Sequence, residues 1–520
     1  MKKKRLAAID IGTNSIRSIV VEANQDGTFR VLDDEKATVR LGDGLHRTGV
    51  ISSDSRRRAL EALARFCKIN EGYGVVKTEA IATSAVRKAA NGIEFIQDVA
   101  QETGLVVSVV TGEEEAELAA LSAVNNFDLE GNRHLLADLG GGSLELVTTI
   151  GRVPDHVVSL ELGAVYLSEN FLSSDPIKED AFQELRRQIR RILRQAFPGE
   201  RPVLHSVIGS GGTLTAIAAM VAASRGEEYS SLHGYELLHA DVVHLQAMLS
   251  RTSLAERRNI PGLNPDRADI IVAGVAVVEA LLDFFHGNLL KINERGIREG
   301  LILRALHRNG CGNGDRKHRT WREAVLSFAV SCHYDAEHSL QVTKLAGQIF
   351  SAVAESFRLG ERERQILEAA AILHDIGYFI NYASHHKHSY HLIRHADLFG
   401  VTPRERELIA LIARYHRKAL PRIKHPEYQR LAKADRLLVS RLSGILRLAD
   451  GLDRRRTSLV TDLDLILGAS RFTIRLRGEG DLSVELFATK AKGELFEQAF
   501  DRRLLLETQP PQPVAPDQTH

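Results

Sequence analysis

Short apolar runs alternate with polar, glycine-containing turns in the first half of the chain. Residues 6–9 are apolar, a polar turn follows at residues 10–15, and residues 16–22 are largely apolar again. Two such runs around a turn predict a pair of antiparallel strands. A second copy of this device starts at residue 138, after the apolar residues 135–137. Two copies predict a duplicated domain with a ligand in the cleft between its halves.

Elsewhere the apolar spacing distinguishes helices from strands. We expect helices at residues 54–70, 113–124, 179–195 and 268–285, and strands at residues 79–81, 105–110, 144–150, 157–160, 203–208 and 292–297. From residue 320 the pattern is helical and rich in histidine, and from about residue 458 to 506 it becomes that of strands. There, residues 472–476 and 482–486 flank a turn and predict a β-hairpin.

A chain of 520 residues is too long to fold around a single hydrophobic core, so several domains are expected. We expect two subdomains at residues 1–124 and 125–300, the first completed by residues 300–308, and then a linker at residues 309–319. We expect a helical domain at residues 320–457, a small β-rich domain at residues 458–508 and a disordered, proline-containing tail at residues 509–520.

Composition narrows the class of protein. The net charge is +1, so overall charge does not indicate a polyanion partner. No apolar run reaches the length of a membrane span, and the basic start leads into a strand rather than a signal peptide. The three cysteines show neither zinc spacing nor a disulfide framework, which predicts a reducing, cytoplasmic location.

The stretch DLGGGSLE at residues 138–145 has the chemistry of a phosphate loop. Gly140, Gly141 and Gly142 carry no side chain, so backbone amides can approach an anion closely. Asp138 and Glu145 frame the loop, and their carboxylates suit Mg²⁺. For this stretch alone, a glycine-rich hairpin with two solvated acids stays open as the alternative.

Three other stretches offer groups to an anion. Thr13, Asn14 and Ser15 in the first turn supply hydroxyl, amide and backbone donors. Arg87 lies at a predicted helix start, which favours an anion, although a solvated arginine is the alternative. Residues 209–213, GSGGT, form a third glycine-rich loop at a switch from strand to helix.

Acids crowd the start of the helix at residues 113–124. Thr111 and Glu114 have the spacing of a capping box. Acids stabilise a helix N-terminus, and one that points into a cleft can also act as a general base.

Six stretches in order resemble the exopolyphosphatase/guanosine pentaphosphate phosphatase (Ppx/GppA) family in its long form. They are DIGTNSIR at residues 10–17, ATSAVRKA at 82–89, GEEEAEL at 112–118, DLGGGSLE at 138–145, GSGGT at 209–213 and GIREGLI at 296–302. The resemblance implies an actin-like α/β module of two ribonuclease-H-like halves, an all-α HD-like domain and a small α+β domain. It also implies Mg²⁺-dependent, processive removal of the terminal phosphate of inorganic polyphosphate, or of the 5′ γ-phosphate of pppGpp.

The resemblance assigns roles by motif. Glu115, directly before the alanine of GEEEA, would be the base that activates water, and Asp138 and Glu145 would hold Mg²⁺. The implied phosphate grip consists of Asp10, Thr13, Asn14, Ser15, Arg87, Gly140, Gly141, Gly142, Ser143, Gly209, Ser210, Gly211, Gly212, Thr213 and Glu299.

The histidine-rich half resembles the HD phosphohydrolases, whose signature is a histidine, an adjacent His-Asp pair and a distant aspartate. The matching residues are His338, His374, Asp375 and Asp450. This donor set suits Mn²⁺, Fe²⁺, Zn²⁺ or Ni²⁺, and His388 and His416 are spaced to extend it to a second metal. Long Ppx members often carry a degraded signature. A metal phosphohydrolase, a structural metal site and a polyphosphate-binding scaffold therefore all stay open.

Two other functional classes compete with the phosphatase. One is a nucleotide-dependent kinase or chaperone-type switch on the same fold, and the other is a polyphosphate or alarmone sensor with an active HD domain. The motif GEEEA favours hydrolysis, because a carboxylate base there activates water. The expected partners are polyphosphate, pppGpp or ppGpp, and a second copy in a homodimer, with no specific nucleic acid and no membrane.

Overall fold

The computed structural model describes residues 4–24, 27–199, 201–308 and 320–508. The chain folds into two compact units, one made of Met1–Glu228 with Leu232–His318 and the other of Tyr229–Ser231 with Arg319–His520. The predicted linker at residues 309–319 and tail at residues 509–520 lie outside the described residues. Among the described helices, none combines the length and the apolar character that crossing a membrane requires.

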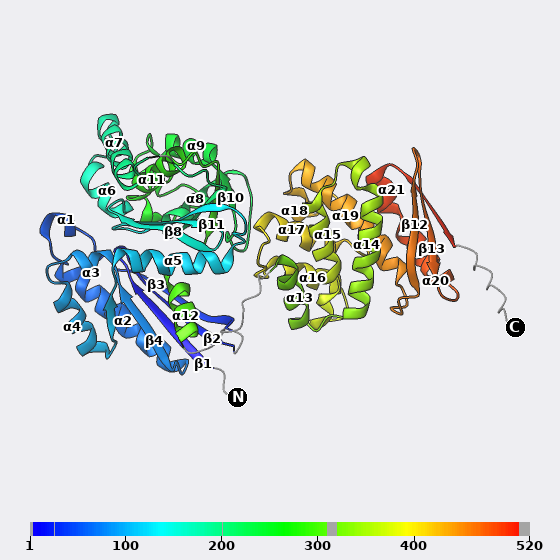
Figure 1. Ribbon diagram of the computed structural model, residues 1–520, viewed down its shortest axis with the longest axis horizontal. Coiled ribbons are helices and arrows are strands. Elements are labelled where there is room, and N and C mark those ends of the chain that lie inside the picture. Colours follow the sequence, from blue (N-terminus) through cyan, green and yellow to red (C-terminus); the bar gives the residue numbers. More distant parts are fainter. Residues whose placement is uncertain (1–3, 25–26, 200, 309–319, 509–520) are drawn as a thin grey trace. The chain divides into compact units, whose positions relative to one another are not determined.

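The first sheet of the first unit has the strand order β3-β2-β1-β4-β5 (Figure 1). Its strands are β1 Lys4–Ile11, β2 Ser15–Ala23, β3 Phe29–Thr38, β4 Lys77–Ala82 and β5 Val107–Val109. β1 and β2 pair antiparallel as predicted, and β4 and β5 continue parallel to β1. The short helices α1 Leu45–Thr48 and α3 Ser84–Lys88 accompany α2 Ser53–Gly72 and α4 Gly92–Thr103. Phe66 of α2 and Phe95 of α4 pack on Ile9 and Ile11 of β1 and bury one face of the sheet.

The second sheet repeats this order as β8-β7-β6-β9-β11, with β10 added at the edge. Its strands are β6 Arg133–Leu139, β7 Leu144–Ile150, β8 Val153–Leu160, β9 Ser206–Ser210, β10 Glu236–Leu238 and β11 Leu289–Asn293. The helices of this half are α6 Ala164–Phe171, α7 Glu179–Ala196, α8 Gly212–Ser224, α9 His239–Leu249, α10 Leu254–Arg257, the 3₁₀ turn η1 Pro265–Arg267 and α11 Ile271–Phe284. The repeated topology confirms the predicted duplication and the actin-like fold of this unit.

Helix α5, Gly112–Asn126, lies between the two sheets (Figure 1). Its residues Leu118 and Ala119 join the apolar cluster of β1 and α12, Ile297–Arg308, while Ala116 and Ala120 pack on the second sheet. Because α5 is covered on both sides, its start is fixed between the two halves. α12 approaches it so closely that a Cβ on Gly300 would overlap the Leu118 carbonyl oxygen.

The second unit begins with helices around one apolar core. They are α13 Trp321–Ser331, α14 Ala336–Phe357, α15 Glu361–Leu373, the 3₁₀ turn η2 Ile376–Phe379, α16 His385–Arg394, α17 Pro403–Arg414, α18 Pro426–Gln429 and α19 Lys433–Leu452. A three-stranded sheet, β12-β13-β14, and two helices follow. They are β12 Val460–Leu467, β13 Arg471–Gly478, α20 Ser483–Lys492, α21 Glu494–Phe500 and β14 Arg503–Thr508.

The predicted hairpin at residues 472–486 is wrong in its second half. β13 forms, but residues 483–492 are the helix α20, and β13 pairs antiparallel with the preceding β12 and parallel with β14. The reason is packing, because Phe496 of α21 joins Phe472 of β13 in the core that also holds the helices. Helices α20 and α21 thus cover the sheet, and residues 482–486 are not available as a strand.

Candidate functional site

A cleft opens in the first unit where the duplicated turns meet. Asp10 lies near the end of β1 and Asp138 occupies the same place in β6. The glycine loops that follow contribute residues 12–15, 139–143 and 211–213 to the lining. The two copies touch at Gly142, where a Cβ would lie 2.6 Å from Ser84 Oγ and 2.8 Å from Thr13 Oγ1. Only glycine therefore allows the two loops to approach this closely.

Strand register places two acids of this site side by side. Asp138 and Glu145 are directly opposite in the β6–β7 pair, so their side chains share one face. Ser210 of the neighbouring β9 donates a hydrogen bond from Oγ to Asp138 Oδ1 at 2.9 Å, and Ser159 Oγ donates to Glu145 Oε1 at 2.9 Å. Each carboxylate is thus held by a serine of an adjacent strand.

The start of α5 adds Glu115 to these acids. The predicted capping box is present, since Thr111 Oγ1 accepts from the Glu114 amide at 3.1 Å and Glu114 Oε2 accepts from the Thr111 amide at 2.9 Å. The cap uses Glu114, whereas Glu115 is only 5% exposed and lines the cleft. The cap thus explains one acid of the run and leaves Glu115 to the site.

Burial and mutual repulsion hold these acids far from their usual titration range. Burial, and then the charges of Glu145 and Asp10, raise the pKa of Glu115 to about 9. Burial followed by the charge of Asp138 raises the pKa of Glu145 to about 8, and burial raises the pKa of Asp10 to about 6. Strongly shifted acids that gather in a cleft are typical of functional sites.

The donor set fits a hard divalent cation. Asp10 Oδ1 and Glu145 Oε2 are buried and have no hydrogen-bond partner among the described residues. Buried carboxylate oxygens without donors are costly, and a cation that prefers oxygen ligands would compensate both their charge and their missing contacts.

The structure brings most of the predicted phosphate-binding residues to this cleft. Those that line it are Asp10, Thr13, Asn14, Ser15, Gly140, Gly141, Gly142, Ser143, Gly211, Gly212 and Thr213, together with Glu115 and Asp138. The predicted phosphate-binding residues outside its lining are Arg87, Gly209, Ser210 and Glu299, and the predicted metal ligand Glu145 also lies outside it. Glu145 and Ser210 line a smaller neighbouring cavity, which shares Asp138 with the cleft.

Two predicted phosphate ligands have other contacts. The Arg87 guanidinium donates to the Val110 carbonyl at 2.6 Å and to Glu115 Oε2 at 3.3 Å, so it orients the carboxylate rather than lining the cleft. Glu299 Oε2 accepts from the Gly296 amide at 2.8 Å, which satisfies a free N–H at the start of α12.

Sequence reasoning missed two arginines of the cleft, Arg17 and Arg267. Arg17 is the seventh residue after Asp10, as Glu145 is the seventh after Asp138, so aligning the two loops would have found it. The Arg267 guanidinium lies directly on Gly212, where a Cβ would overlap it. Neither guanidinium has an ion pair within 4.0 Å among the described residues, so both are available to an anion.

The raised pKa values predict how stability depends on pH. A carboxyl whose pKa is higher in the folded state stabilises the fold while protonated and loses that contribution as pH rises through the folded pKa. For Glu115 this contribution is lost between pH 4.5, the ordinary pKa of a glutamate, and pH 9, because its pKa in the folded protein is about 9. In the absence of divalent cations, the Tm of Glu115→Gln minus the Tm of the wild type should increase by more than about 3 °C when the pH is raised from 5 to 9. Thermal unfolding followed by fluorescence would test this, and a pH-independent difference would contradict it.

Two family models match the chain. The Ppx/GppA phosphatase family matches residues 20–309, more than half of the sequence, and Ppx/GppA phosphatase domain III matches residues 321–483. The chain belongs to the Ppx/GppA phosphatase family. The resemblance found in the six motifs is thereby confirmed, and membership supports a phosphatase function.

Solved structures of this family resemble the chain as well. An exopolyphosphatase from Cytophaga hutchinsonii is 28% identical with a TM-score of 0.55, over 59% of this chain and 98% of that chain. The Aquifex aeolicus member of the Ppx/GppA family is 27% identical with a TM-score of 0.52, over 59% of this chain and 99% of that chain. An exopolyphosphatase-like protein is 26% identical with a TM-score of 0.55 over 59% and 99% of the two chains.

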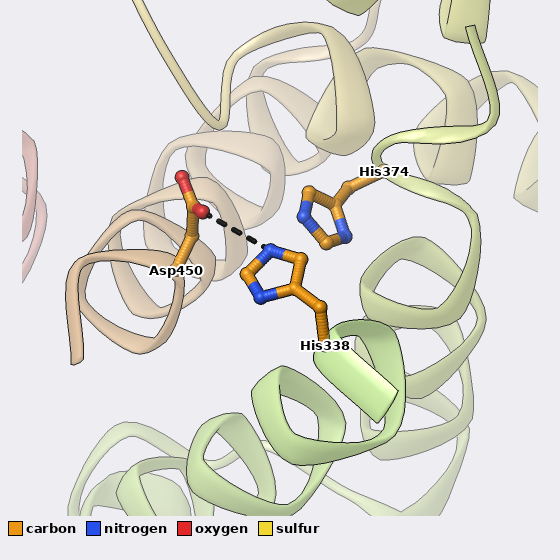
Figure 2. A group of neighbouring side chains, drawn as sticks. All are labelled: His338, His374 and Asp450. Carbon is orange, nitrogen blue, oxygen red and sulfur yellow. Dashed lines mark ion pairs between the residues drawn. The ribbon is translucent and has the colours of Figure 1, made fainter. Parts of the chain in front are cut away.

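The second unit, which contains domain III, gathers a second set of possible ligands. Figure 2 shows His338 of α14 facing Asp450 of α19, with His374 at the end of α15 beside them. Among the residues that the structure describes, two groups each bring their possible ligand atoms within 4.8 Å of one another. One consists of His338, His374 and Asp450, and the other of Asp375, His385 and His416. We call these six residues the histidine centre.

Each histidine of the histidine centre is oriented through Nδ1. This atom lies 2.8 Å from Asp453 Oδ2 in His338, 2.7 Å from the Ala371 carbonyl in His374, 3.1 Å from the Tyr382 carbonyl in His385 and 2.6 Å from the Ala413 carbonyl in His416. An Nδ1–H that donates to oxygen leaves the Nε2 lone pair for a metal, as in His374 and His416. In His385 the Nε2 atom already accepts from the Arg417 guanidinium at 3.2 Å, and a metal there would replace this contact.

Asp375 lies at the middle of this arrangement. Its Oδ1 is 3.2 Å from His385 Nε2 and 3.5 Å from His416 Nε2, and its Oδ2 is 3.6 Å from His374 Nε2. Burial lowers the pKa of His374 and of His416, so both rings are neutral near pH 7. Neutral imidazoles around a carboxylate have the chemistry of a transition-metal site.

His388, predicted as an additional ligand, belongs to neither group among the described residues, and the structure places His385 in the second group. η2 packs so closely on the start of α16 that a Cβ on Gly377 would overlap the His385 carbonyl oxygen. This contact holds the first residue of α16 at the centre, whereas His388 lies three residues further along the helix. The sequence run HHKH could not show which histidine points inward.

Proposed function

We propose that this protein is an exopolyphosphatase that hydrolyses the terminal phosphate of inorganic polyphosphate with Mg²⁺. The observation that carries the proposal is the buried Glu115 in a cleft lined by glycine loops, by acids and by Arg17 and Arg267. Removal of the 5′ γ-phosphate of pppGpp is the alternative, because its terminal phosphate presents the same group. The exopolyphosphatase and exopolyphosphatase-like names of two similar structures support the first choice.

Mg²⁺ would be held by Asp138 and Glu145, with Asp10 as a further ligand. When bound, it would neutralise charge on the phosphate and on the acid cluster, so that Glu115 is ionised near neutral pH. The two unpartnered carboxylate oxygens of Asp10 and Glu145 support this assignment.

The remaining chemistry belongs to the chain's own residues. Amides of residues 141–143 and 211–213 bind the oxygens of the terminal phosphate, and Arg17 and Arg267 bind the charge of the preceding phosphates. Arg87 holds Glu115 in place, and Glu115 accepts a proton from the attacking water. The water oxygen bonds to the terminal phosphorus, and the bridging P–O bond breaks to give orthophosphate and a shortened chain. Positioning and charge compensation dominate such phosphoryl transfer.

Arg267 provides a test of polyphosphate binding. Arg267→Met should raise the KM for polyphosphate by about tenfold with a smaller change in kcat, because a charged hydrogen bond to substrate contributes about 1.5 kcal/mol or more. Arg258, which directly follows α10 and is exposed, is a matched control, and Arg258→Met should leave KM unchanged. Equal KM values in steady-state assays of both variants would remove Arg267 from the binding site.

Phosphate release tests the proposed activity directly. The purified full chain should release orthophosphate from long-chain polyphosphate in the presence of Mg²⁺, with pppGpp assayed in parallel. Release from pppGpp alone would favour alarmone control. Release from neither, in a folded protein, would make the first unit a sensor of these anions.

A second activity is a candidate for the second unit. We propose that the histidine centre binds one or two transition-metal ions, with His338, His374 and Asp450 as one site and Asp375, His385 and His416 as the other. The inward Nε2 atoms of His338 and His374, buried without a hydrogen-bond partner among the described residues, support metal binding. A metal phosphohydrolase and a structural metal site are the two roles that such a centre can serve.

A further inference from the structure

A lysine from the C-terminal part of the second unit contacts the histidine centre. Lys492, the last residue of α20, forms an ion pair with Oδ2 of Asp450. The two side chains are only 19% and 13% exposed. Oδ1 of the same carboxylate lies 3.6 Å from His338 Nε2, the contact drawn in Figure 2. Lys492 thus binds one oxygen of Asp450 and leaves the other to the histidines.

The position of Lys492 is fixed by unusually close helix packing. A Cβ on Gly451 of α19 would lie 2.8 Å from the Thr489 Cα atom of α20, and one on Gly444 would lie 3.0 Å from the Phe496 Cα atom of α21. Gly444 and Gly451 therefore let the two C-terminal helices approach the backbone of α19 closely. Asp450 lies between these two glycines in the sequence. The match to domain III ends at residue 483, before Lys492.

We propose that Lys492 is an internal counter-ion that competes with metal for Asp450. This inference rests on the proposed metal centre. An ammonium group beside a ligand carboxylate repels a divalent cation bound to the same carboxylate. Without metal, the same ammonium compensates the charge of Asp450 together with His338, the other ion-pair partner of this carboxylate. Lys492 therefore stabilises the metal-free protein and keeps metal binding weak enough for exchange.

Lys492→Met tests both halves of this proposal on the full chain. Zn²⁺ affinity, measured by competition with a chromophoric chelator, should become about tenfold or more tighter, because a nearby positive charge is removed. The metal-free Tm should fall, and saturating Zn²⁺ should recover more of it than in the wild type. Lys490, exposed on the same helix, is the matched control, and Lys490→Met should change neither quantity.

If Lys492 had only a structural role, Lys492→Met would change the Zn²⁺ affinity in the opposite direction. If Lys492 only positioned Asp450, its loss would weaken Zn²⁺ binding, and unchanged or weaker binding overturns the proposal. Lys492→Gln, which keeps a hydrogen-bond donor but removes the charge, serves if the methionine variant does not fold.

His374→Ala separates the proposed role of Lys492 from the proposed metal centre. If it binds Zn²⁺ as tightly as the wild type, the centre itself is wrong; if it loses binding while Lys492→Met and Lys492→Gln do not tighten it, only the role of Lys492 is wrong.

Discussion

Glu115→Gln should lower the turnover of polyphosphate by about a thousandfold, since a positioned general base commonly contributes about two to four orders of magnitude. Glutamine has nearly the same shape but cannot accept the proton of the attacking water. It also removes one negative charge from the acid cluster, so substrate binding should be retained or tightened. The measurement is kcat from orthophosphate release, together with the Kd for polyphosphate.

The neighbouring glutamates provide the control for this experiment. Glu113 is exposed near the start of the same helix, whereas Glu115 is buried in the cleft. Glu113→Gln should therefore keep wild-type turnover. If Glu115→Gln, folded and binding polyphosphate, also kept near-normal turnover, the base would have to be another acid of the cluster.

His374→Ala should abolish Zn²⁺ binding at its group in the histidine centre. His374 is completely buried, and its Nδ1 contact to the Ala371 carbonyl leaves Nε2 to face Asp375. Loss of this ligand should reduce occupancy at micromolar free Zn²⁺ from about one equivalent to about a tenth or less, because metal affinity depends on a complete ligand set. Equilibrium dialysis followed by metal analysis measures this directly.

His388 supplies a matched control for the metal experiment. It lies on α16 in the same histidine run, but neither group of possible ligands among the described residues includes it. His388→Ala should therefore keep the Zn²⁺ occupancy of the wild type, while His385→Ala should lower the occupancy of the second group only. Loss of metal on replacing His388 would show that the sequence-based ligand assignment was better than the structural one.

Sequence alone was enough to identify the class of protein and the loops of its cleft. The repeated turns after residues 10 and 138, the capping box at Thr111 and the order of six motifs are local patterns, and local backbone chemistry suffices to read them. The spacing of apolar and glycine residues predicted the duplication and the glycine loops, because it fixes strands and turns. The actin-like fold was implied by the resemblance of the six motifs to the Ppx/GppA family.

Tertiary structure decided which side chains face one another. It showed that Arg87 holds Glu115, that Arg267 lines the cleft, and that His385 rather than His388 lies in a group of possible metal ligands. It also turned residues 483–492 into a helix, which packs Leu486 on the core, while the following α21 buries Phe496 and Phe500 there. Such choices depend on contacts between residues far apart in sequence, as between Asp450 and Lys492, and no local pattern encodes them.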